Sequence, residues 1–82
     1  MLCDKAKAMM KIRDFAATNN WSVLDYLILD KRDDKLSFAM TYLQNGELWG
    51  AVIIDDKIVE NGSTGCELAT KYIAEYFREE VM

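Results

Sequence analysis

The dipeptide Asn45-Gly46 constrains the fold of this chain more than any other feature. It separates residues 36–43 from residues 47–54, two runs rich in the aromatic and β-branched residues that favour strands. Asn and Gly both tolerate the positive φ angles of a type I′ turn, so the two runs are expected to form an antiparallel hairpin. A weaker turn signal, Asp55-Asp56, leads into a third short run, residues 57–60. The sequence therefore predicts a three-stranded antiparallel meander.

Amphipathic helices are expected on both sides of the meander. Over residues 4–18 apolar residues recur every three or four positions with basic residues between them, which predicts a helix that Asp4 caps and that stops at the following pair of asparagines. A second stripe predicts a helix over residues 65–80, where Thr64 and Glu67 have the spacing of a capping box. The first stripe consists of Ala8, Met9, Ile12, Phe15 and Ala16, and the second of Ala69, Tyr72, Ile73, Tyr76 and Phe77.

Residues 22–30 fit either a strand or a helix, because their apolar positions neither alternate cleanly nor leave a polar helical face. As a strand, the segment would pair with the meander across residues 31–34 and give the order α-β-β-β-β-α. As a helix capped by Ser22, it would give α-α-β-β-β-α. The aromatic and β-branched residues favour the strand. Either order makes residues 1–82 a single α+β domain, with a three- or four-stranded antiparallel sheet over residues 22–61 and the two helices packed on one face.

The composition argues against several classes of function. The 82 residues are 51% hydrophobic and 29% charged, as in one small globular domain. There is no histidine, so the usual general base and the commonest metal ligand are missing, and we expect neither an enzyme nor a bound cofactor or metal. Ten basic residues against fourteen acidic ones give a net charge of −4, the wrong sign for a general phosphate binder. The acidity is concentrated in residues 51–82.

The sequence favours a protein of the reducing cytoplasm. Charged residues interrupt the N-terminal segment before any apolar core of a secretory signal, and the longest apolar run, residues 23–29, is too short for a membrane span. The two cysteines, Cys3 and Cys66, do not resemble a disulfide framework.

With residues 22–30 as a helix, residues 22–81 contain a series of pieces in the order helix, three strands, helix. The pieces are VLDYL in the first helix, Phe38 in the first strand, ELWGAVII in the second, IVENG before the last helix and ATKYIAEYF within it. In the last piece, Ala69, Ile73 and Ala74 have the spacing of small residues that pack close to a sheet. This part of the chain resembles the double-stranded RNA-binding domain.

The resemblance implies RNA contacts at the first helix, at the loop between the first two strands and at a lysine cluster that begins the last helix. The loop here, residues 44–46, lacks the family's Pro-His pair, and residues 63–70 contain neither Lys nor Arg. Without cations to neutralise phosphate, the resemblance implies a member that makes protein contacts instead.

A non-catalytic protein-binding surface is therefore the leading expectation. Both faces of residues 47–54 are apolar, so one covers the core and the other needs a second layer, either the remaining helix or a partner chain. Gly50 would allow another backbone to approach closely. The residues expected to meet a partner with a basic surface are Trp49 as an apolar anchor and the acidic Asp55, Asp56, Glu60 and Glu67. A chain of this size and charge is also similar to small inhibitors of phages and mobile elements, anti-CRISPR proteins among them, some of which imitate nucleic-acid phosphate.

Two other binding functions remain open. The first helix carries a basic set that could bind RNA through a surface other than the family's own: Lys5, Lys7, Lys11 and Arg13. A homodimer could form through the uncovered sheet face or through the helix around residues 72–77.

Three features could carry chemistry, and each has a simpler structural explanation that we favour. Cys66 in the first turn of a helix could be an activated nucleophile, but we favour a small packing residue, because no histidine can act as its base and Glu67 opposes a thiolate. Residues 61–65 (NGSTG) could cradle a phosphate, or form a turn with a helix cap. Three carboxylate pairs could bind metal, although adjacent acids are more typical of solvated turns: Asp33-Asp34, Asp55-Asp56 and Glu79-Glu80.

Overall fold

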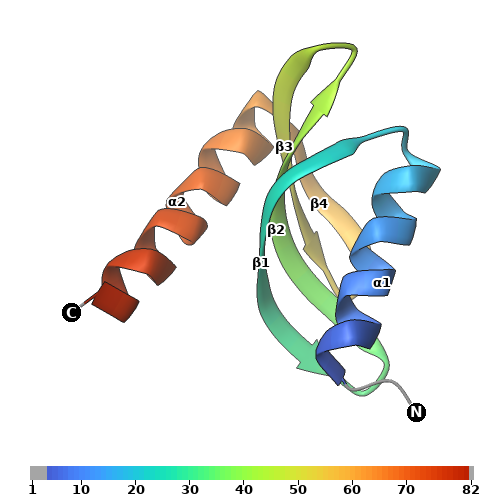
Figure 1. The fold of residues 1–82 in the computed structure, drawn as a ribbon, viewed down its shortest axis with the longest axis vertical. Coiled ribbons are helices and arrows are strands. Elements are labelled where there is room, and N and C mark those ends of the chain that lie inside the picture. Colours follow the sequence, from blue (N-terminus) through green and yellow to red (C-terminus); the bar gives the residue numbers. More distant parts are fainter. Residues whose placement is uncertain (1–3, 82) are drawn as a thin grey trace.

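A four-stranded antiparallel sheet lies between two helices in the computed structural model of the chain, which describes residues 4–81 (Figure 1). The elements are α1 (Asp4–Thr18), β1 (Ser22–Arg32), β2 (Lys35–Gln44), β3 (Glu47–Ile54), β4 (Lys57–Gly62) and α2 (Ser63–Val81). Each strand pairs with its neighbours in sequence, which gives the sheet order β1-β2-β3-β4. The predicted α+β fold, an antiparallel meander flanked by N- and C-terminal helices, is confirmed. Cys3 lies outside the described residues.

Residues 22–30 form a strand, the alternative that their composition favoured. β1 pairs with β2 along its length, with register shifts after Val23 and after Ile28. Each shift adds one residue to β1 and resets the alternation of its side chains, which explains why the apolar pattern of this segment is irregular. The helix that the resemblance to the double-stranded RNA-binding domain assigns to VLDYL is therefore a strand.

All three connections between strands are two-residue turns: Asp33-Asp34, Asn45-Gly46 and Asp55-Asp56. The φ angle is positive at Asp33, at both residues of the second turn and at both residues of the third. Asp and Asn enter this left-handed region at lower cost than most residues. Both predicted hairpin turns are confirmed, and two of the three carboxylate pairs are turn residues. The side chains of the third pair, Glu79-Glu80, lie outside the described ones.

α1 ends where the asparagine pair predicts. Asn20 has a φ of 59°, its N–H donates to the carbonyl of Ala17 at 3.2 Å, and the N–H of Trp21 donates to the carbonyl of Ala16 at 2.9 Å. This is the pattern of a Schellman motif, which satisfies carbonyls at a helix end. Trp21 then stacks on Tyr42 of β2, with ring centroids 4.0 Å apart. Asp4 is the first described residue of α1, and its predicted capping contact lies outside the described side chains.

The helices cover opposite faces of the sheet, which corrects the expectation that both pack on one face. Successive strand residues point to opposite sides, so neighbouring positions of β2 belong to different layers. One layer joins α1 to β2 and β3 through Ala8, Ile12, Ala16, Phe38, Met40, Tyr42, Ala51 and Ile53. The other joins α2 to the same strands through Ala39, Val52 and Ala69. Because β3 is apolar on both faces, each face acquires its own helix (Figure 1).

α2 meets β3 backbone to backbone at Gly50 and Gly65. A Cβ at Gly50 would lie 2.6 Å from the backbone nitrogen of Cys66 and 2.9 Å from the carbonyl carbon of Gly65. The close approach expected at Gly50 is confirmed, and the approaching backbone is that of α2. The helix begins at Ser63, two residues before its predicted start, so Thr64 lies inside its first turn and is not the cap.

Candidate binding surfaces

Trp49, the predicted apolar anchor, is half-buried at the border of the core. It lies opposite Tyr42 in the register of β2 and β3, on the α1 face, where it is half-buried against the first hydrophobic layer. Part of its side chain therefore packs within the molecule, and the remainder is exposed.

The Asp55-Asp56 turn is tied to the start of β2. The backbone N–H of Asp55 donates to the hydroxyl of Ser37 at 3.0 Å, and the carboxylate of Asp56 accepts the backbone N–H of Leu36 at 3.0 Å. Asp56 also accepts from the Lys11 ammonium of α1 at 3.4 Å and donates its own N–H to the Leu36 carbonyl at 2.9 Å. These bonds connect β2, the β3–β4 turn and α1, so the position of Asp56 is explained by structure.

The acidic residues expected to share a surface are spread over the molecule. Trp49 lies near the start of β3, and Asp55 follows its end, about 20 Å away at roughly 3.3 Å per residue. Glu60 is exposed opposite Val52, on the α2 face, whereas Trp49 is on the α1 face. The structure does not bring the predicted site residues together as one patch.

Glu67 borders an apolar hollow beside α2. The hollow, of about 580 Å³, lies between one flank of the helix and the β2–β3 hairpin and is lined by Leu48, Ser63, Cys66, Glu67, Thr70, Lys71 and Ala74. Leu48 is 54% exposed at its rim. Of the predicted acidic residues, Glu67 lines this hollow, and Asp56 lines a second apolar hollow beside Phe15 and Phe38.

Exposed aromatic residues extend the sheet-facing side of α2 toward its C-terminal end. Gly65 and Ala69 are buried against the sheet, and helical periodicity continues their face through Tyr72 and Tyr76 at seven and eleven residues from Gly65. Tyr72 is 37% exposed, Tyr76 42% and the neighbouring Phe77 54%. Phe77 and Tyr76 contact each other edge to face, with centroids 5.8 Å apart. We call Tyr72, Tyr76 and Phe77 the aromatic stripe.

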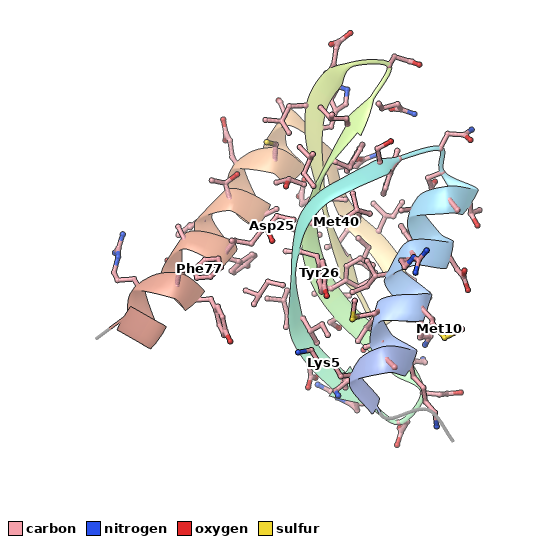
Figure 2. All side chains as sticks on the ribbon, viewed as in Figure 1. Lys5, Met10, Asp25, Tyr26, Met40 and Phe77 are labelled. Carbon is pink, nitrogen blue, oxygen red and sulfur yellow. The ribbon has the colours of Figure 1, made fainter. Side chains whose placement is uncertain are left out.

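The aromatic stripe is exposed because α2 diverges from the sheet. The helix is close to β3 at its beginning and moves away from the strands toward its C-terminal end (Figure 1). Figure 2 shows Phe77 projecting from α2, and Asp25 projecting from β1, into the interval between these two elements. The apolar spacing of the helix predicted these residues as core, and the signal that the sequence offered for their exposure is the change from Gly65 and Ala69 to large aromatic residues along one face.

The basic residues of α1 do not form one flank. Lys11 and Arg13 are two residues apart, so their side chains point in nearly opposite directions around the helix. Lys7 and Lys11 instead join two lysines of the β1–β2 hairpin around a hollow of about 550 Å³, lined by Lys7, Ala8, Lys11, Lys31, Asp33, Asp34, Lys35 and Leu36. The hairpin lysines were not predicted, because their approach to α1 depends on the fold.

The features that could carry chemistry have structural roles in the described residues. A Cβ at Gly65 would meet the carbonyl of Gly50, so the NGSTG segment packs on β3. Cys66 is half-buried above the same glycine. Between residues 4 and 81, no group of three or more Cys, Asp or Glu residues converges as a metal site would require.

Tyr42 is a buried titratable residue whose pKa the fold shifts. Burial raises the pKa of Tyr42 above its ordinary value, opposed by its hydrogen bond with the amide oxygen of Asn61 and reinforced by Cys66. The hydroxyl ties β2 to β4 across β3, and it lies inside the α1 layer, where we see no binding role for it.

No model of a known protein family, no curated protein and no solved structure matches this chain. In the part of the chain that the structure describes, neither helix has the length and hydropathy that a membrane-spanning segment needs.

Proposed function

We propose that this chain is a non-catalytic protein-binding module of the cytoplasm that holds a partner protein against the aromatic stripe. The observation that carries the proposal is the exposure of three large aromatic side chains on α2. Two of them, Tyr72 and Tyr76, lie on the helix face that Gly65 and Ala69 bury against the sheet two turns earlier. Contiguous apolar surface of this kind marks interaction sites, and aromatic residues supply much of the energy at the centre of protein interfaces.

The charge around the aromatic stripe supports a basic partner. Asp25 of β1 projects toward α2, and Glu75 precedes Tyr76 on the helix itself. The whole chain carries a net charge of −4. A partner surface that combines an apolar pocket with Lys or Arg residues would match this arrangement, since complementary charge speeds association and suppresses wrong partners. An acidic inhibitor of the phage or mobile-element type would act in this way.

A capture experiment tests the proposal. The tagged protein is recovered from its native cells with RNase treatment, in parallel with the double variant Tyr76→Ala/Phe77→Ala and with the control Met9→Ala/Met10→Ala, which removes exposed apolar side chains from α1. We expect a stoichiometric protein that the wild type and the control retain and the stripe variant loses. Equal recovery of that protein by all three, with each variant folded by circular dichroism, would contradict the proposal.

The hollow lined by lysines favours a second candidate, binding of RNA phosphate. It brings Lys7 and Lys11 of α1 together with Lys31 and Lys35 of the hairpin, although Asp33 and Asp34 reduce its charge. Binding to a 20-base-pair RNA should then weaken steeply as salt rises, and the Lys7→Glu/Lys31→Glu variant should abolish it. An affinity that does not change with salt would exclude this candidate.

A further inference from the structure

The outer edge of β4 is open. The strand pairs with β3 on one side, and in residues 4–81 no element pairs with its other side, where backbone groups are left for another strand. Residues Lys57 to Glu60 are all exposed, and the two in the middle are apolar: Ile58 is 43% exposed and Val59 53%. An exposed apolar edge strand is a template for pairing with another chain.

The opposite edge of the sheet differs. β1 carries two register shifts, after Val23 and after Ile28, and four charged residues: Asp25, Asp30, Lys31 and Arg32. Bulges and charges are the devices by which natural proteins keep an edge from pairing. The centre of β4 has no charge, although it contains one register shift of its own.

That register shift places two opposite charges on one face. Lys57 lies opposite Ile54 and Glu60 opposite Val52, and these β3 residues, two apart, share the α2 face. Lys57 and Glu60 therefore also share this face, although they are three positions apart in the strand. Neither makes an ion pair within the described residues.

The edge is consequently complementary to itself. If a second β4 lies antiparallel to the first, centred between Ile58 and Val59, Lys57 of each copy falls opposite Glu60 of the other. Two-fold symmetry makes this pair twice, with the four apolar side chains between the two ion pairs. Opposite charges in facing positions stabilise a strand pair, and like charges destabilise it.

We propose that β4 pairs with β4 of a second copy of this chain and joins the two sheets into one of eight strands. A second copy is the expected partner of this edge because of its charges: when two Lys-Ile-Val-Glu segments run antiparallel, each Lys57 faces a Glu60. This contact does not depend on the aromatic stripe. α2 crosses the sheet from β4 toward β1, so its last turns lie near the β1 edge, away from the edge formed by β4 (Figure 1). The dimer therefore leaves the proposed partner surface available, and either proposal can fail without the other.

Charge reversal of the full chain tests the pairing, with light scattering after size exclusion and sedimentation equilibrium over about 1 to 100 µM. The wild type should dimerise. The variants K57E and E60K each create two like-charge contacts and should weaken dimerisation by about tenfold or more, whereas K57E/E60K restores opposite charges and should return close to the wild-type dissociation constant.

A mixture of the two single variants gives the sharpest result. K57E and E60K should form a heterodimer when mixed, although each alone is mostly monomeric, because all facing charges then have opposite signs. The matched reversals on β1, D30K and K31E, should leave the dissociation constant unchanged. A wild type that stays monomeric at 100 µM, a mixture that fails to associate, or a dimer that only the β1 reversals disrupt would overturn the proposal. Circular dichroism melting of each variant shows that the monomers are folded.

Discussion

Replacing Gly50 by Ala should displace α2 from the sheet. The added Cβ would lie 2.6 Å from the Cys66 nitrogen and nearer still to the Cys66 Cα, and ordinary van der Waals contact begins at 3.4 Å. The helix backbone therefore has to move by at least 0.8 Å, the difference of the two distances for the nitrogen. The atoms in the way belong to the backbone of a helix, which cannot rotate aside as a flexible side chain does. The strain must therefore move α2 or bend β3.

The cost follows from the penalty for overpacking. An extra methylene in a packed core costs typically 1–3 kcal/mol, and a backbone obstacle belongs in the upper half of that range, about 2 kcal/mol or more. For a domain of this size, 2 kcal/mol lowers Tm by about 8 to 16 °C. Thermal melting followed by circular dichroism and urea unfolding, with wild type and G50A in the same buffer, would measure both quantities.

Gly46→Asn is a suitable control for this experiment. A Cβ at Gly46 has no atom within 4 Å, and Asn tolerates the left-handed conformation of that turn, so its Tm should fall much less than that of G50A. If G50A melts within 2 to 3 °C of the wild type, roughly 0.5 kcal/mol, the close contact between α2 and β3 is not what positions the helix.

Three further outcomes test other parts of the structure. Replacing Asp56 by Ala should lower the free energy of unfolding by about 1 to 2 kcal/mol, because the Leu36 N–H loses its acceptor. Replacing Lys11 by Met should lower it by under about 1 kcal/mol, because the ion pair between Lys11 and Asp56 is half-exposed. Equal losses for the two variants in urea unfolding would refute this difference. Burial raises the pKa of Tyr42 above its ordinary value of about 10, so the folded state retains that proton to higher pH than the unfolded state does. The contribution of Tyr42 to stability should therefore be constant below about pH 10 and decrease above it. Tyr42→Phe should reduce that decrease in unfolding curves measured between pH 8 and 11. Phe77→Ala should cost under about 1 kcal/mol and Phe38→Ala about 3 to 5 kcal/mol, since Phe38 is buried and Phe77 exposed; similar losses would mean that the aromatic stripe belongs to the core.

Local chemistry accounts for what the sequence predicted well. Turns such as Asn45-Gly46 and the asparagines after α1 act through their own backbone preferences, which do not depend on distant residues. The apolar character of both faces of β3 likewise required a second layer. It did not reveal that α2 supplies this layer, because the face that a helix covers is decided by the direction in which the chain leaves the last strand.

The binding surfaces could be predicted only in part. Asp56 has the composition of a solvated turn residue, and its bonds to Leu36 and Lys11 arise from positions 20 and 45 residues away in sequence. The apolar spacing of Tyr72 and Tyr76 is that of a core helix. Their exposure results from the angle at which α2 leaves the sheet, and the change from Gly65 and Ala69 to large aromatic residues is the one local sign of that angle.

The short turns described above also bear on how fast the chain folds. Each strand is joined to the next by two residues, so every pairing in the sheet is between sequence neighbours and closes a minimal loop. Sheets of low contact order form without a long conformational search, and hairpins close in about 1–10 µs. The strands can therefore pair one after another as the chain leaves the ribosome, and α1, which precedes them in the sequence, is already available to cover one face of the sheet. Attachment of α2 would then be the last step, and the contact between Gly50 and Gly65 would form late.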